Sequence, residues 1–348
     1  MRIFDQSRKR QLRESDLNFQ NILVIDFGQL GDVILSLPAL KAIRERFPVA
    51  KISLLLGKPG ADIVRLARVA DEHILVDRVQ LRDGNKIASL ATILGLIKDV
   101  RGRRFDLIID LNSLSETNIL GFLSGARWRL YANRENRSMD WLGRFPSRPP
   151  KEDKSKHYTD RYFDALIPLG IEPFDRKFRL DPPEENAAEI DSLFDQLDIA
   201  DKVRIGVFIG AGHPSRCWSV DKFAELTRRL VQDSSNAVLV FLGPEEIHML
   251  ETVRKSFPPE SVILHKLELL PLMAAAAGLD VLVSNDTGPV HLAAVAGAPI
   301  ILILDKRAPA CFLPLAERLC VLNDFTIDEL TVEHVFDAIQ RFMPRKNR

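Results

Sequence analysis

The sequence predicts an α/β protein built from two doubly wound, Rossmann-like domains that face each other across a cleft. In both halves of the chain, short runs rich in Ile, Val and Leu alternate with stretches of helical periodicity, as in parallel sheets covered by helices. Each half also contains an apolar run followed at once by a tight turn and a helix start, at residues 22–32 and 281–291. The length of 348 residues favours two domains over one.

The first half of the chain begins with an apolar run at residues 21–27, which predicts a buried strand. The helical spacing that follows ends at Pro48, a residue that stops helices. Further strands are expected at 51–56, 73–76 and 106–110, and helices at 32–47, 62–68, 86–100, 116–123 and 157–169.

Residues 127–156 interrupt this alternation. They contain nine Lys or Arg residues against four acids, together with three prolines. We expect a long basic loop here. Two interpretations are equally good on sequence grounds: a solvated charged surface, or a surface that binds an acidic ligand.

The second half repeats the alternation after a boundary expected at Asp181-Pro182-Pro183. Strands are expected at 203–209, 237–242, 262–264, 280–283 and 299–304, and helices at 220–231, 245–257, 267–277, 287–296 and 331–342. The chain therefore divides into a basic segment at 1–20, a first domain at 21–180, a second domain at 184–330 and a C-terminal helix at 331–348.

The composition argues against a nucleic-acid partner, because 48 Lys and Arg residues are balanced by 48 acids. The three cysteines lack the spacing of metal ligands and do not form an even disulfide set, which predicts free thiols in a reducing compartment. The basic segment 1–20 has no apolar core, so no signal peptide is expected, and its five cations against three acids support contact with anionic lipid only weakly. The longest apolar stretch, 292–304, is shorter than the roughly 20 residues that span a bilayer. We expect a cytoplasmic protein.

The two helix starts carry the candidate chemistry. Helix N-termini at the carboxyl ends of parallel strands present free N–H groups and a positive dipole to anions. Asp32, in the first turn, is suited either to cap the helix or to act as a general base. In the second turn Thr287 and His291 share a helix face, and Gly288 allows close approach of the backbone to a ligand. The alternative for the second turn is an ordinary cap followed by a helix with a packed histidine.

Three segments carry a resemblance to a known family. They read ILVIDFGQLGDVILSLPAL at 22–40, GVFIGAG at 206–212 with RCW at 216–218 and FAEL at 223–226, and SNDTGP at 284–289 with HLAA at 291–294. In this order they resemble glycosyltransferase family 9, which includes the lipopolysaccharide heptosyltransferases, over roughly residues 21–339. The resemblance implies a two-domain fold of the B type (GT-B), with an acceptor-binding first domain and a second domain that binds a nucleotide sugar, typically ADP-heptose. It also implies inversion at the anomeric carbon, without a metal or another cofactor.

The resemblance also implies roles for individual residues. Asp32 is the expected general base, and the donor diphosphate is expected to bind Asp286, Thr287, Gly288 and His291. Arg216, two residues before a tryptophan, is expected to neutralise phosphate, although a solvated surface arginine is its ordinary alternative. The donor ribose is expected at Glu246 or Glu245, and acceptor-side contacts are expected at Gln29, Gly31, Arg134 and Arg137.

The sequence departs from the family pattern in two places. Many members have two small hydroxyl residues where this chain has Gly28 and Gln29, and many have a glycine-containing loop where Asp305-Lys306-Arg307 stands. These departures leave the sugar and base specificity open.

The function expected from the resemblance is an inverting transfer of heptose from ADP-heptose to a lipopolysaccharide core or lipid A acceptor. The partners would be the nucleotide sugar, that acceptor and the inner face of the cytoplasmic membrane. Three alternatives stay open. They are the same chemistry with another donor or acceptor, such as a protein hydroxyl or another surface glycan; a non-catalytic nucleotide-sugar-binding homologue; and a nucleotide-sugar epimerase.

Overall fold

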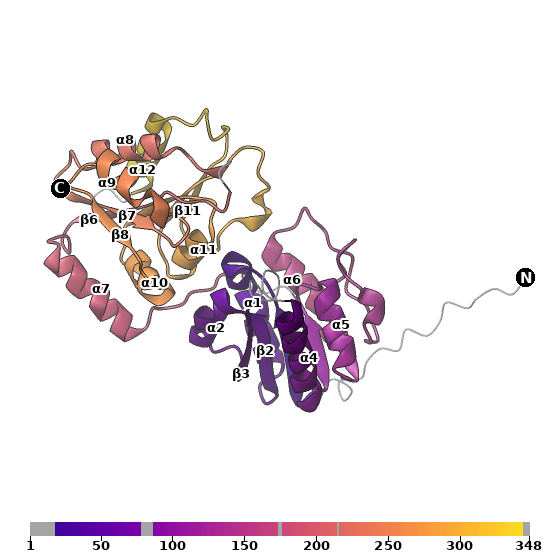
Figure 1. Cartoon of the computed structure of the whole chain (residues 1–348). Helices are drawn as coiled ribbons and strands as arrows, with labels where there is room; N and C mark the ends of the chain where they lie inside the picture. The colour runs from indigo at the N-terminus through magenta and orange to yellow at the C-terminus, as the bar shows by residue number, and fades with distance from the viewer. Residues whose placement is uncertain (1–17, 78–85, 173–175, 214–215, 344–348) are drawn as a thin grey trace, which may run out of the picture. The chain divides into compact units, whose positions relative to one another are not determined.

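The computed structural model describes residues 18–77, 86–172, 176–213 and 216–343, without the side chains of residues 86–88. The chain forms two compact units, Met1–Arg176 and Lys177–Arg348, shown in Figure 1. The expected boundary at Asp181-Pro182-Pro183 lies near the start of the second unit. The five cations of the basic segment, at positions 2, 8, 9, 10 and 13, lie outside the described residues.

The first unit contains a parallel five-stranded sheet with the order β3-β2-β1-β4-β5. Its strands are β1 (Asn21–Asp26), β2 (Lys51–Gly57), β3 (Glu72–Val76), β4 (Leu107–Asp110) and β5 (Trp128–Tyr131). Its helices are α1 (Leu30–Arg46), α2 (Ala61–Ala67), α4 (Lys86–Gly102), α5 (Ser115–Leu123) and α6 (Tyr158–Leu166), with 3-10 turns η2 (Lys58–Gly60), η3 (Asp140–Leu142) and η4 (Ile167–Leu169).

Helices cover both faces of this sheet. α1 contacts α2 and α6, whereas α4 contacts α5 (Figure 1). The alternate β1 residues Leu23 and Ile25 pack in one cluster with Val100 of α4 and Leu120 of α5. A strand buried on both faces reads as a continuous apolar run, which is why the sequence predicts β1 so clearly.

The prediction of one long basic loop at residues 127–156 is wrong. The stretch begins with β5, which pairs in parallel with β4, and it returns to the sheet through a bridge between Arg129 and Arg144. The guanidinium of Arg129 donates to the carbonyls of Leu142 (3.1 Å) and Ala126 (2.6 Å). Because these bonds give the guanidinium N–H groups acceptors within the fold, a charged residue is compatible with an edge strand here.

The second unit contains a parallel six-stranded sheet with the order β11-β10-β9-β6-β7-β8. Its strands are β6 (Val203–Phe208), β7 (Asn236–Leu242), β8 (Val262–His265), β9 (Val281–Asn285), β10 (Ile300–Ile303) and β11 (Leu319–Leu322). Its helices are α7 (Glu184–Gln196), α8 (Val220–Leu230), α9 (Leu250–Ser256), α10 (Leu269–Ala277), α11 (Gly288–Val295) and α12 (Val332–Phe342), with 3-10 turns η6 (Ile247–Met249) and η7 (Ala310–Phe312). α12 packs against α8 within this unit.

Most predicted elements of both units are present, with ends that differ by about one or two residues. Besides β5, the elements α7 and β11 were not predicted from the sequence. A helix was also predicted at 245–257, where the structure has a turn and the short elements η6 and α9. Among the predicted site residues, this correction affects Glu245 and Glu246, which precede the helical segment instead of beginning it.

The strand orders define where a ligand is expected. Each sheet reverses its strand order once, between β1 and β4 in the first unit and between β6 and β9 in the second. Ligands of open α/β sheets bind at the carboxyl ends of strands at such a switch point. The predicted fold class, with a doubly wound sheet in each half, is confirmed. Among the described residues, no helix is both long and apolar enough to cross a bilayer.

Candidate functional site

Asp32 lies in the first turn of α1, next to the carboxyl end of β1. Its Oδ2 accepts a hydrogen bond from the backbone N–H of Gln29 at 3.0 Å. The structure corrects the predicted N-cap: Gln29 occupies that position, and Asp32 is the third helical residue, whose bond to the N–H of Gln29 stabilises the helix start as in a capping box. Asp32 is half-buried, as are Leu30 and Gly31, whereas Gln29 is exposed. Capping and reaction with a ligand are compatible, because a carboxylate has two oxygens with several acceptor positions.

A second acid beside Asp32, missed by the sequence analysis, is Asp26 at the end of β1. Asp26 is fully buried, and its carboxylate accepts from Ser36 Oγ (2.5 Å) and from the N–H of Gly28 (3.2 Å). Burial raises the pKa of Asp26 to about 6, and the negative charge of Asp32 acts in the same direction. A polar residue that ends an otherwise apolar strand was the signal available in the sequence.

Gly28 lies between these two acids, close to both side chains. A Cβ at this position would lie 2.5 Å from Cβ of Asp32 and 3.3 Å from Oδ1 of Asp26. The turn therefore has no room for a side chain.

We expect Asp26→Asn to change how stability depends on pH. Since the folded state raises the pKa of Asp26 to about 6, the unfolding free energy falls as the pH rises from about 4 to about 6, and the variant loses this dependence. Asparagine can accept from Gly28 and donate to Ser36 Oγ, which in turn donates to the carbonyl of Val33 at 2.8 Å. Measured by denaturant unfolding, the unfolding free energy of the variant minus that of the parent should be about 3 kcal/mol larger at pH 7 than at pH 4. The exposed Asp62→Asn is the control, and an unchanged difference at both pH values would contradict the expectation.

The end of β4 faces the end of β1 and carries further buried polar groups. Asn112 accepts from the N–H of Phe27 and donates to the hydroxyl of Tyr162 at 3.4 Å, so it connects the two strand ends with α6. Asp110 is fully buried and accepts from Thr117 Oγ1 and from Nδ2 of Asn118. Burial raises the pKa of Asp110 to about 6. No role was predicted for this strand end from the sequence.

The structure separates the two arginines predicted on the acceptor side. Arg137 is exposed, whereas Arg134 is 5% exposed. Nε of Arg134 lies 3.7 Å from Glu152, which also pairs with Arg161 at 3.4 Å. Both guanidinium groups lie over the ring of Tyr158, at 5.4 and 5.3 Å from its centre.

Arg134 is thus part of a buried charge cluster. Burial alone would lower its pKa, but Tyr158, Tyr162 and Glu152 outweigh this effect and raise it. The positive charge of Arg134 in turn opposes part of the rise that burial causes in the pKa values of Asp26 and Asp110. Arg134 therefore partly balances the buried acids of the first unit.

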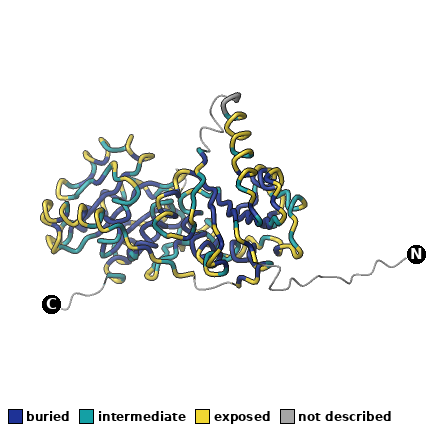
Figure 2. Tube along the Cα trace, turned by 90° about the horizontal axis from the view of Figure 1, so that it is seen from below, coloured by how far each residue is buried: buried dark blue, intermediate teal, exposed yellow. Residues whose placement is uncertain are grey.

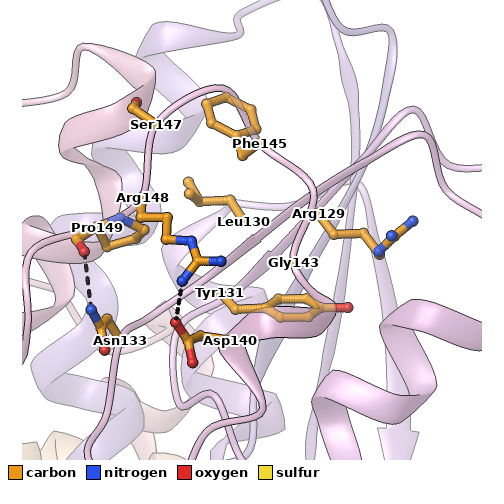
Figure 3. Close-up of a pocket in the computed structure, with 10 residues that line it drawn as sticks. All are labelled: Arg129, Leu130, Tyr131, Asn133, Asp140, Gly143, Phe145, Ser147, Arg148 and Pro149. Carbon is orange, nitrogen blue, oxygen red and sulfur yellow. Dashed lines mark hydrogen bonds and ion pairs between the residues drawn. The ribbon is translucent and has the colours of Figure 1, made fainter. Parts of the chain in front are cut away.

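A pocket beside β5, shown in Figure 3, contains none of the predicted site residues. Arg148 and Asp140 form an ion pair across it at 3.4 Å, and Asn133 donates to the carbonyl of Pro149. The pocket is lined by Arg129, Leu130, Tyr131, Asn133, Asp140, Gly143, Phe145, Ser147, Arg148 and Pro149.

In the second unit, Asn285 holds the ends of β6 and β9 together. It is fully buried, and its Nδ2 donates to the carbonyls of Ile209 (2.9 Å) and Gly210 (3.3 Å). Its Oδ1 accepts from the N–H of Trp218 at 3.0 Å. The side chain of Asn285 therefore positions both the Gly210 turn and the segment that carries Arg216.

The structure brings together two of the predicted diphosphate ligands, Arg216 and Asp286. Nη1 of Arg216 lies 3.3 Å from Oδ2 of Asp286. Burial raises the pKa of Asp286, and Arg216 opposes this effect. The guanidinium is 55% exposed and projects from the switch point, where an anion can reach it.

The remaining predicted diphosphate ligands lie at the start of α11. Thr287 occupies the N-cap position and Gly288 the first helical position, and both are half-buried. His291 is 5% exposed and lies one turn further into the helix. The first turn of α11 thus presents its N–H groups next to the Arg216–Asp286 pair.

The two glutamates predicted for the ribose differ in the structure. Glu245 is exposed, whereas Glu246 is 7% exposed and accepts from the N–H of Gly243 at 3.0 Å. Burial raises the pKa of Glu246. A Cβ at Gly210 would lie 2.0 Å from Oε1 of Glu246, so this carboxylate packs directly on the turn after β6. Glu246, unlike Glu245, belongs to the switch point.

The unusual segment after β10 forms a closed ion pair. Nε and Nη2 of Arg307 donate to the two oxygens of Asp305 at 2.7 and 2.8 Å, and the N–H of Ile327 donates at 3.1 Å. These contacts, above all the bidentate bonds from Arg307, hold the pKa of Asp305 well below its usual range. No group of three or more His, Cys, Asp or Glu side chains in the described ranges is arranged to hold a metal ion.

The two doubly wound sheets, each with polar side chains at its switch point, form the GT-B architecture. The profile of glycosyltransferase family 9 (heptosyltransferase) matches residues 93–331. The chain belongs to this family and is a glycosyltransferase.

Three similar proteins illustrate the relationship. Lipopolysaccharide heptosyltransferase 3 of Escherichia coli K12 is 21% identical over 320 residues, which are 90% of each chain. The structure of E. coli ADP-heptose lipopolysaccharide heptosyltransferase II matches with a TM-score of 0.75 at 17% identity, covering 93% of this chain and 98% of the other. E. coli heptosyltransferase WaaC with ADP matches with a TM-score of 0.70 at 20% identity, covering 92% and 99%. At these identities the structural matches show the fold alone.

Proposed function

We propose that the protein transfers heptose from ADP-heptose to a lipopolysaccharide core or lipid A acceptor, with inversion and without a metal. The names of the relatives support the substrate class: one acts as a lipopolysaccharide heptosyltransferase, and another carries ADP in its structure. The observation that carries the proposal is the position of Asp32, a half-buried carboxylate in a helix first turn at the switch point of the first sheet.

In the proposed reaction, Asp32 takes the proton of the acceptor hydroxyl while the oxygen of that hydroxyl attacks the anomeric carbon of the heptose. The bond from that carbon to the diphosphate breaks on the opposite side, and ADP leaves with the electron pair. The first turn of α11 and the Arg216 guanidinium stabilise the charge that develops on the diphosphate. Asp286 orients Arg216 through their contact at 3.3 Å.

The other predicted residues take supporting roles in this proposal. Thr287, Gly288 and His291 complete the diphosphate site, and Glu246 binds the ribose, for which exposed Glu245 is the weaker candidate. On the acceptor side, Gln29 and Gly31 form the turn around Asp32, and Arg137, which is exposed, contacts acceptor anions in this proposal. Arg134 is buried and does not contact the acceptor in this proposal; it partly balances the charge of the buried acids Asp26 and Asp110. We also propose that the protein works in the cytoplasm at the inner membrane face, without a nucleic-acid partner.

Calorimetric titration with ADP, UDP and GDP, each with and without Mg²⁺, tests the donor assignment. We expect ADP to bind most tightly, independently of Mg²⁺, and Arg216→Ala to weaken binding about tenfold, as for the loss of one charge-assisted bond. Arg254→Ala, which removes an exposed arginine of α9 paired with Glu251, should leave the affinity unchanged.

Other outcomes would separate the alternatives. Preference for UDP or GDP would overturn the ADP-heptose donor while keeping the fold. No nucleotide binding would favour a non-catalytic homologue. Product analysis with ADP-heptose distinguishes transfer from epimerisation, because epimerisation proceeds without an acceptor.

A further inference from the structure

Large apolar side chains are exposed on one part of the first unit. Seven of the twelve exposed large hydrophobic residues in the described ranges lie on α4, α5 and η3. Two of these elements carry the same pattern, with exposed residues at positions i, i+3 and i+4. We call the set the α4–α5 surface; it consists of Leu90, Ile93 and Leu94 on α4, Ile119, Phe122 and Leu123 on α5, and Trp141 on η3.

These elements are neighbours in the fold. α4 contacts α5, and α5 contacts η3. The side chains are far from buried: Leu90 and Leu94 are each 57% exposed, Phe122 is 49% exposed and Trp141 is 67% exposed. Residues 90–95 of α4 are exposed without interruption, which Figure 2 shows beside the grey residues at the helix start. Apolar patches rimmed by polar groups mark sites of interaction, because water is a poor solvent for them.

Cations border this surface. Arg101 of α4 is exposed and donates to the carbonyl of Leu123 at 3.2 Å. The guanidinium of Arg129 lies 5.4 Å from the ring centre of Phe122. Lys98, Arg104 and Arg127 are also exposed on the same or adjoining segments. The nearby acids are fewer: Asp99, which pairs with Arg103, Glu116 in the first turn of α5, and Asp140 on η3, which pairs with Arg148.

We propose that the α4–α5 surface docks on an anionic lipid bilayer. The apolar side chains would enter the boundary between headgroups and acyl chains, with Trp141 at headgroup level, while the bordering arginines contact lipid phosphates. A second copy of the chain is the less suitable occupant, because a self-complementary interface would bring the same cationic borders together. The inference rests on the proposed function, in which the acceptor is anchored in a membrane.

Co-sedimentation of the full-length protein with vesicles tests this surface without donor or acceptor. We expect binding to vesicles that contain phosphatidylglycerol and much weaker binding to vesicles of phosphatidylcholine alone. Leu94→Gln combined with Phe122→Gln should weaken binding about tenfold or more, and Arg101→Gln combined with Arg127→Gln should weaken it on anionic vesicles in particular. The matched control, Val49→Gln with Leu197→Gln, changes two exposed apolar residues elsewhere and should bind like the parent.

Several outcomes would overturn the proposal. These are an absence of vesicle binding by the parent protein, equal binding by the Leu94 and Phe122 variant, or a dimer in sedimentation velocity that only this variant loses. Because the substituted side chains are exposed, circular dichroism should report unchanged folding in each variant. Failure of the proposed function is recognised separately: vesicle binding without heptosyl transfer to a detergent-solubilised acceptor would refute the activity and leave the docking surface standing.

Discussion

Replacing Asp32 with asparagine is expected to lower kcat for heptosyl transfer by about 10²- to 10⁴-fold, the range for removal of a general base. An amide cannot take the proton of the acceptor hydroxyl. Its oxygen can still accept from the N–H of Gln29, now 3.0 Å from Oδ2, so the start of α1 should be retained. The measurement is kcat with ADP-heptose and a lipopolysaccharide core acceptor, together with the melting temperature of the variant.

Asp62→Asn is the matched control for this experiment, because Asp62 also lies in the first turn of a helix, α2, and is exposed. It should keep full activity. ADP affinity should stay unchanged in Asp32→Asn, since the proposed nucleotide site belongs to the second unit. Full activity of the Asp32 variant would refute the assignment of Asp32 as the base. A melting temperature so low that the variant is unfolded in the assay would show that Asp32 stabilises the start of α1 and would explain the lost activity without a catalytic role.

Replacing Asn285 with alanine is expected to lower the unfolding free energy by about 3 kcal/mol and to abolish most ADP binding. The substitution leaves the N–H of Trp218 and the carbonyl of Ile209 without their side-chain partner in a buried site, and each such group costs about 1–3 kcal/mol. It also frees the turn after β6 and the segment that carries Arg216. Chemical denaturation and ADP calorimetry on the same preparation measure both effects.

Asn323→Ala serves as the control, because Asn323 is an exposed asparagine that follows β11 in the same unit. It should change neither quantity appreciably. If Asn285→Ala lowered stability but left ADP affinity intact, the switch point of the second sheet would not be the nucleotide site. If neither quantity changed, the network around Asn285 would not hold the strand ends.

The sequence predicted the buried strands well because each one is surrounded by apolar neighbours on both faces. β1 and β9 read as short apolar runs ended by turns, and helices bury their stripes against them. The elements that it missed lack this signal. α7 has five acids among its 13 residues and buries Ile190 and Phe194, whereas all four residues of β11 are half-buried. A strand without buried positions, such as β11, leaves little alternation to recognise.

The candidate site was predicted where it depends on local sequence. Asp32, Thr287 and Gly288 lie directly after apolar strands, and a helix start that follows a strand can be recognised within about ten residues. Arg216 also lies where its motif places it, but its contact with Asp286 bridges 70 positions of the chain. Glu246 could not be separated from Glu245, because burial of one and exposure of the other depend on packing against Gly210.

The sequence by itself determined the two-fold repetition of a doubly wound sheet, the family, and the two helix starts at which chemistry is expected. The tertiary structure alone decided the charge environment of the first of these starts. It buries Asp26 and Asp110 near the cation of Arg134, and it places the Asn285 side chain among the backbone groups of Ile209 and Trp218. The physical reason is that apolar periodicity depends on residues that are close together in the sequence. The pKa of a carboxyl group and the partner of a buried amide depend instead on residues that only folding brings within a few ångströms.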